Sequence, residues 1–269
     1  MNIESSALLK SSYSRSALLV ISCDRYSDLW SPFFEAFFKN WSDCPFNVYL
    51  LTNYLDYKSN YPVKVLKVGE DISWSDNLLA GLEQLDNYKH VFLMLEDMFI
   101  DKCVNTNRVN TILSEFYKLN GTSISFLNEP KCSQLLNKYF GVIGEKSIYR
   151  VTVTFTLWNI VSLLSILKSG ESAWDFEKKG PVRARSYKNI CSVQKNEISF
   201  IHGVIKGKWL PSAINSLRKI GINVELSDRV IIPLSQELRF RLYQKLRFFA
   251  FKVIPAYLIR KIFSKTILF

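Results

Sequence analysis

The chain has 269 residues, 48% of them hydrophobic and 22% charged, which suits a globular protein and excludes a largely disordered chain. Its five cysteines are odd in number and widely spaced, which argues against a disulfide framework and a structural zinc site and favours a reducing cytosol. The net charge is +11, but residues 236–269 carry +7 of it (eight Lys and Arg against one Glu), so the basicity is local and indicates no nucleic-acid partner.

The first third of the chain has the pattern of an α/β domain. Residues 1–15 are Ser-rich and are expected to form a flexible N-terminus. Continuous apolar runs predict strands buried on both faces at residues 16–23 and 90–95, and further strands are predicted at 47–52 and 63–68. Helices are predicted at 28–41, where Phe and Trp residues share one side, and at 76–85. This order is typical of a mostly parallel sheet flanked by helices.

The rest of the chain continues this alternation with weaker patterns. Helices are predicted at residues 107–119, 160–168 and 211–220, with a further helix opening at 170–177. Strands are predicted at 123–127, at 151–158 and at 198–205. The one boundary that the composition suggests lies near Pro233. We therefore expect one domain over residues 16–233, followed by a basic helical tail over 234–269.

Acidic residues follow two of the predicted buried strands. Asp24 comes after the first strand, with Tyr26 close behind, and Glu96 and Asp97 come after the fourth. In parallel α/β sheets, ligands bind at the carboxyl ends of strands. Here Asp24 can accept hydrogen bonds from a base or ribose, Tyr26 can stack on a base, and acidic groups can bind a divalent cation. The alternative is that Asp24 caps the following turn and Asp97 caps a helix.

Four segments carry a resemblance to a known family. They are C-D-R-Y-S-D-L-W from residue 23, W-S-D-C-P-F-N-V-Y-L-L-T-N from residue 41, L-E-D-M-F-I from residue 95 and E-S-A-W-D-F-E from residue 171. Over about residues 17–225 the chain resembles GT-A-fold glycosyltransferases, and in particular bacterial proteins from capsule and O-antigen gene clusters. The resemblance implies a Rossmann-like GT-A sheet. It also implies transfer of a sugar from a nucleotide sugar, foremost a UDP-sugar, to a polyprenyl-diphosphate-linked or oligosaccharide acceptor.

The resemblance also implies a donor site with a metal. Asp24, Tyr26, Glu96 and Asp97 would bind the donor, and Asp97 would hold Mn²⁺ or Mg²⁺, although Glu96-Asp97 departs from the Asp-X-Asp motif of the broader fold. The segment from His202 to Trp209 is similar to the His-Gly-Lys-Trp pattern of glycogenin-like transferases, with a different spacing. That similarity implies a second metal ligand, His202, and a diphosphate contact, Lys206.

A second acidic cluster spans residues 171–177. A transferase that inverts the anomeric centre needs a carboxylate to deprotonate the acceptor hydroxyl, and an aromatic face for a sugar ring. The resemblance implies Glu171 as that base, with Asp175 as the second candidate, and Trp174 offers the aromatic face. Arg183 and Arg185, which follow Gly180-Pro181, could also reach a phosphate, and the alternative is that they are exposed loop cations. For the acidic cluster, the alternative is a solvated helix start that exploits the helix dipole.

The basic tail has the pattern of a membrane-surface helix. Leu238, Leu242, Leu246, Phe249 and Val253 form one helical stripe, interleaved with cations. Such a helix fits the interface of an anionic bilayer, whereas the alternative is packing on the domain or a dimer interface. No uncharged run approaches the ~20 residues of a membrane span, and no signal peptide is recognisable. We expect a cytoplasmic protein, peripheral on the inner face of the cytoplasmic membrane.

Two other functions remain open alternatives. A sugar-phosphate nucleotidyltransferase shares the general sheet, but that chemistry favours a Gly-rich loop after the first strand, and the Cys23–Asp28 segment has no glycine. A non-catalytic scaffold that assembles a membrane complex through the tail would make the carboxylates at the strand ends incidental.

Overall fold

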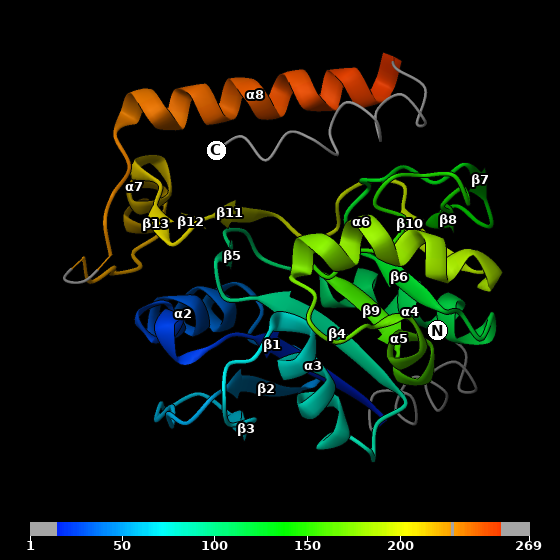
Figure 1. The fold of residues 1–269 in the computed structure, drawn as a ribbon, viewed down its shortest axis with the longest axis horizontal. Helices are drawn as coiled ribbons and strands as arrows, with labels where there is room; N and C mark the ends of the chain where they lie inside the picture. The colour runs from blue at the N-terminus through cyan, green and yellow to red at the C-terminus, as the bar shows by residue number, and fades with distance from the viewer. Residues whose placement is uncertain (1–14, 227–228, 254–269) are drawn as a thin grey trace.

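The computed structural model describes residues 15–226 and 229–253 (Figure 1). The strands are β1 (Ser16–Ile21), β2 (Asn47–Thr52), β3 (Val63–Lys67), β4 (His90–Leu95), β5 (Met98–Ile100), β6 (Ser123–Ser125), β7 (Gln134–Leu135), β8 (Phe140–Val142), β9 (Thr156–Asn159), β10 (Ile190–Val193), β11 (Phe200–His202), β12 (Val204–Ile205) and β13 (Lys208–Trp209). The helices are η1 (Asp24–Leu29), α2 (Trp30–Asn40), α3 (Trp74–Glu83), α4 (Thr106–Lys118), α5 (Ile160–Ile166), α6 (Ala173–Arg183), η2 (Ala184–Ser186), α7 (Pro211–Lys219) and α8 (Leu234–Val253). The predicted flexible N-terminus, apart from Arg15, and the end of the predicted tail lie outside the described residues.

A nine-stranded sheet in the order β3-β2-β1-β4-β9-β6-β10-β8-β7 forms the centre of the molecule. The first four strands are parallel, and strand β1 pairs with both β2 and β4. The chain therefore winds from β1 outward to β3 and then crosses back to β4 on the other side of β1. This reversal is a topological switch point, which in open α/β sheets opens a crevice at the carboxyl ends of the two strands.

The other half of the sheet is mixed. Strand β9 runs antiparallel to both β4 and β6, β10 is parallel to β6, and β8 and β7 are antiparallel additions. The predicted α/β class with flanking helices is confirmed. A mostly parallel arrangement describes the first four strands, whereas the complete sheet is mixed because β9 is inserted in the opposite direction.

Helices cover both faces of the sheet, which explains why its strands read as unbroken apolar runs. On one face, Leu18 and Val20 of β1 share a hydrophobic cluster with aromatic residues of α2 and with side chains of α4 and α7. On the other face, Leu19 and Ile21 share a second cluster with side chains of α3, α5 and α6. Figure 1 shows this three-layer arrangement, with helices on either side of the sheet. Successive side chains of β1 therefore point alternately into the two hydrophobic clusters, one on each face of the sheet.

Two small two-stranded sheets, β5 with β11 and β12 with β13, lie beyond the carboxyl end of β4. The strand predicted at residues 198–205 is broken at Gly203, where an added Cβ would lie 2.3 Å from the ring of Phe99. Lys206 (φ 49°) and Gly207 (φ 74°) then form a tight turn with both residues in the left-handed region, as in type I′ hairpins. This hairpin leads directly into α7.

The tail begins close to the predicted boundary, with α8 starting at Leu234. In Figure 1, α8 runs along the outside of the molecule, beside α7 and apart from the main sheet. Within residues 15–226 and 229–253, no helix combines the length and the apolar character needed to cross a lipid bilayer.

Candidate functional site

The carboxyl ends of β1 and β4 meet at the switch point of the sheet. Ser22 to Tyr26 follow β1, and Glu96 and Asp97 follow β4 in the tight turn before β5. The segment after β11 approaches the same edge, because the backbone N–H of Gly203 donates to the carbonyl of Asp97 at 2.8 Å. Three chain segments that are distant in the sequence therefore converge at one place.

The antiparallel pairing of β11 with β5 brings Asp97 and His202 together. His202 is in register with Met98, and its Nε2 lies 3.4 Å from Oδ2 of Asp97. The other carboxylate oxygen, Oδ1 of Asp97, is buried and has no hydrogen-bond partner among the described residues. A buried polar atom without a hydrogen-bond partner lowers the stability of the folded protein, so such an atom usually binds a water, an ion or a ligand. The two predicted metal ligands are thus neighbours, and one of them has unused acceptor capacity.

This pair fits a divalent cation that shares its ligands with substrate. Carboxylate oxygen and imidazole nitrogen suit Mn²⁺, and Mg²⁺ is commonly held by one or two carboxylates together with waters and substrate phosphates. In the described part of the chain, no group of three or more His, Cys, Asp or Glu side chains is arranged to hold a metal. A cation held by Asp97 and His202 would therefore take its remaining ligands from water or from phosphate oxygens.

Glu96 is more deeply buried than most carboxylates. Its side chain is buried, and that burial, followed by the repulsion from Asp97, raises the pKa of Glu96 well above its usual range. These effects favour the neutral carboxylic acid. The Glu96-Asp97 motif consequently carries less negative charge than two ionised carboxylates would, and Asp97 is the member that is suited to a cation.

Asp24 has a structural role at the same edge. Its carboxylate accepts hydrogen bonds from the backbone N–H groups of Asn53 at 2.9 Å, Tyr54 at 2.9 Å and Leu55 at 3.2 Å. In return, the side-chain oxygen of Asn53 accepts a bond from the backbone N–H of Asp24 at 3.1 Å. These bonds clamp the turn after β1 to the turn after β2. This clamp resembles the turn-capping alternative but acts on a different strand end, and the donor-binding role of Asp24 stays a prediction.

Tyr26 is covered on one side by an arginine that sequence reasoning missed. The guanidinium of Arg229 lies 4.4 Å from the centroid of the Tyr26 ring. It donates to both carboxylate oxygens of Asp28, at 2.8 and 2.6 Å, and to the carbonyls of Gly207 and Arg25. Arg229 thereby ties the β12–β13 hairpin to η1, and exposed Lys206 stands at the tip of that hairpin. One face of Tyr26 is therefore already occupied. The sequence around Arg229 contains no local pattern that predicts its contact with Tyr26 and Asp28.

The second acidic cluster is fully engaged in structural interactions. Glu171 is 4% exposed, and its two carboxylate oxygens accept from Arg183 at 3.0 and 2.6 Å. Its backbone N–H donates to the hydroxyl of Ser75 at 2.9 Å, which attaches it to the start of α3. This pairing occupies both Glu171, the predicted general base, and Arg183, the predicted phosphate contact, so either role would require the pair to open, and both stay predictions.

Asp175 is also a structural residue, the third residue of α6. It forms a capping box with Ser172, the residue that caps the helix, and an ion pair with Lys179 at 3.0 Å. Hydrogen bonds from Ser172 and Lys179 lower the pKa of Asp175, which makes it a poor proton acceptor. The helix-start alternative therefore describes Asp175. Trp174, by contrast, is 54% exposed and presents an aromatic surface beside this helix start.

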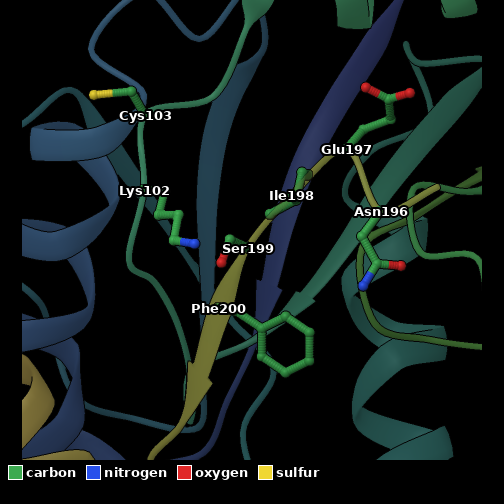
Figure 2. Close-up of a pocket in the computed structure, with 7 residues that line it drawn as sticks. All are labelled: Lys102, Cys103, Asn196, Glu197, Ile198, Ser199 and Phe200. Carbon is green, nitrogen blue, oxygen red and sulfur yellow. The ribbon is translucent and has the colours of Figure 1, made fainter.

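A separate cavity of about 470 Å³ is lined by Lys102, Cys103 and residues 196–200 (Figure 2). It lies at the other end of the β5–β11 ribbon from Asp97 and His202, since Phe200 pairs with Ile100. Its only carboxylate, Glu197, is bound by Arg108 at 2.9 Å. This lining holds one cation, Lys102, and a carboxylate that is already paired, and it lies away from the switch point, so the switch-point edge is the better candidate site.

Comparison of the chain with protein-family models finds no match, and comparison with curated proteins finds none either. Functional inference for this protein accordingly depends on the geometry of the site.

Proposed function

We propose that this protein is a glycosyltransferase that binds a nucleotide sugar, foremost a UDP-sugar, at the carboxyl ends of β1 and β4. The observation that carries the proposal is the Asp97–His202 pair at the switch point of the sheet. Nε2 of His202 lies 3.4 Å from Oδ2 of Asp97, and Oδ1 of Asp97 has no hydrogen-bond partner in the described part of the chain. Nucleotides bind at such switch points in open α/β sheets, outside the carboxyl ends of the strands.

The chemistry of the pair fits the diphosphate of a nucleotide sugar. Asp97 and His202 would hold Mn²⁺ or Mg²⁺, and such a cation neutralises negative charge that develops on a diphosphate leaving group. The raised pKa of Glu96 favours its neutral form, which would lower the local negative charge that an anionic ligand meets. Exposed Lys206, at the tip of the hairpin above the same edge, adds a positive charge for the phosphates.

The remaining residues of the edge position these groups. Arg229 holds the hairpin against η1, and the Asp24 clamp holds the turn after β1. Trp174 offers an exposed aromatic face of the kind against which sugar rings pack, so it is the candidate for acceptor contact. Neither Glu171 nor Asp175 is assigned as the general base, because Arg183, Ser172 and Lys179 occupy their oxygens. We propose a lipid-linked or oligosaccharide acceptor, as the family resemblance implies.

The test is a thermal-shift panel of nucleotides with and without Mn²⁺, followed by an assay for slow hydrolysis of UDP-sugars. We expect UDP with Mn²⁺ to raise the melting temperature, and His202→Ala to remove most of the Mn²⁺-dependent part. Lys179→Ala, which changes an exposed cation next to Asp175, is the control and should respond as the wild type does. Stabilisation by nucleoside triphosphates alone would support nucleotidyl transfer instead. No response to any nucleotide would contradict the proposal and support a scaffold.

A further inference from the structure

Helix α8 exposes a continuous row of leucines. Leu234, Leu238, Leu242 and Leu246 are each 58–61% exposed, and their spacing of four residues places them along one side of the helix. Single exposed apolar residues are ordinary, but a contiguous apolar row on a helix marks an interaction surface. We call these four residues the leucine stripe.

The opposite part of the helix holds α8 on the rest of the protein. Glu237 is 1% exposed, and its carboxylate accepts a hydrogen bond from the backbone N–H of Ser212 at 3.1 Å and a second bond from the Ser212 hydroxyl. Arg241 donates to the same carboxylate at 2.9 Å. We call the contacts of Glu237 with Ser212 and Arg241 the latch. Because Glu237 is buried in the latch and its neighbour Leu238 is exposed, the latch holds the helix with the leucine stripe facing away from α7. The alternative that this stripe packs on the domain is excluded for these leucines.

The net charge of the α8 sequence is positive. The sequence of the helix contains five Lys or Arg residues and one acid, Glu237, which is buried in the latch. At about 100° per residue, exposed Arg239 and Arg241 lie on opposite flanks of the stripe, each about 80° from its middle. An apolar stripe flanked by arginines is the arrangement of a helix that lies in the interface of an anionic bilayer.

We infer that α8 docks the protein on an anionic lipid bilayer, with the leucine stripe buried at the headgroup boundary and exposed Arg239 in the headgroup layer, whereas Arg241 stays paired with Glu237. Charge complementarity favours lipid over a second copy of this chain, because two copies meeting through the stripe would bring like charges together. This inference does not depend on the proposed nucleotide site.

Bilayer docking would also orient the candidate site. The carbonyl of Gly203, whose N–H is bound to Asp97, accepts from the backbone N–H of Leu210 at 2.9 Å. Helix α7 starts at the next residue, Pro211, and its second residue, Ser212, meets Glu237 of α8. A short, hydrogen-bonded path therefore connects the docked helix to the edge that holds Asp97 and His202, so a lipid-linked substrate would meet the site at a set orientation.

The experiment is co-sedimentation of the full chain with vesicles of phosphatidylcholine, with or without phosphatidylglycerol. We expect the wild type to bind the vesicles that contain phosphatidylglycerol, less so at high salt. The variant Leu238→Ser/Leu242→Ser/Leu246→Ser should bind about tenfold more weakly or worse, because it loses its apolar contact. The control Val161→Ser/Leu164→Ser removes exposed apolar side chains from α5 and should bind as the wild type does.

Two results would overturn the inference. One is vesicle binding by the triple serine variant at wild-type strength. The other is a wild-type dimer in light scattering that the variant converts to a monomer while neither protein binds vesicles. Circular dichroism and the thermal shift with UDP and Mn²⁺ confirm that the variant is folded. Since that shift does not involve the stripe, failure of lipid docking is distinguishable from failure of nucleotide binding.

Discussion

The protein contains two acidic clusters that look alike in the sequence and behave differently in the fold. At the end of β4, Asp97 has a buried oxygen without a partner in the described chain, and its closest basic group is His202 at 3.4 Å. At the start of α6, Glu171 and Asp175 have their oxygens bound by arginine, lysine and serine. The first cluster lies where strands end at a switch point, and the second joins α6 to α3.

The property that distinguishes the two clusters is whether donors of the protein itself already bond the carboxylate oxygens. A structural carboxylate is stabilised by the protein's own donors, so it has nothing left for a ligand. A binding carboxylate keeps acceptor capacity at some cost to stability, as functional sites often do. Four variants test whether each of these groups serves ligand binding or stability, and they are described in order of decreasing expected effect.

Asp97→Asn tests the binding side of the contrast. We expect a loss of about 100-fold or more in UDP-sugar turnover, because an amide is a much weaker ligand for a cation than a carboxylate. The free energy of unfolding should change by less than about 1 kcal/mol, since the lost charge has few partners. The control is Asp56→Asn, an exposed carboxylate paired with Lys67, which should leave turnover unchanged. Turnover at wild-type level in Asp97→Asn would contradict the assignment.

Glu171→Gln tests the structural side. It leaves Arg183 without its charged partner, so we expect the free energy of unfolding to fall by about 2–3 kcal/mol in urea denaturation. Turnover per folded molecule should stay near that of the wild type. The double variant Glu171→Met/Arg183→Met should recover much of the lost stability, because it removes both charges. A folded Glu171→Gln protein with normal nucleotide binding and no turnover would restore Glu171 as the general base.

Asp24→Ala sharpens the contrast, because Asp24 lies at the binding edge but is bonded like the structural cluster. Removing it leaves the backbone N–H groups of residues 53–55 without their acceptor. We expect a loss of about 1–3 kcal/mol of unfolding free energy by chemical denaturation. Below its lowered melting temperature, the variant should still show a thermal shift with UDP and Mn²⁺. Complete loss of that shift at a wild-type melting temperature would assign Asp24 to the donor instead.

Ser172→Ala removes the cap of α6 and should have the smallest effect, about 1 kcal/mol of unfolding free energy at neutral pH. The capping bonds lower the folded-state pKa of Asp175, so the stability that it contributes is present above its unfolded pKa, about 3.9. That contribution is lost as the pH falls through the lower, folded-state pKa. Denaturation at several pH values should therefore show the two proteins converging in acid, and a gap that widens in acid would contradict the capping role.

Strands β1, β2 and β4 were predictable because their pattern is local and nearly all of their residues are buried. The ranges 47–52 and 90–95 coincide with β2 and β4, and the boundaries of α4 and α7 are met within a residue. Prediction was poorer where a strand depends on neighbours. Within the predicted 151–158 region only residues 156–158 lie in a strand, β9, which ends at Asn159. Gly203 divides the strand predicted at 198–205, since close packing on Phe99 and Trp209 has no local signature.

The α/β class, the buried strands, the segments that end at the candidate site and the start of the basic helix were all predictable from the sequence alone. These depend on periodicity and composition, which are properties of short stretches of chain. Only the tertiary structure decided which acidic cluster is left with an open oxygen. The partner of Asp97 comes from β11 through an antiparallel register, and the latch that turns the leucine stripe outward joins α7 to α8. Contacts between segments distant in the chain carry no local pattern, and they separate a site from a structural ion pair.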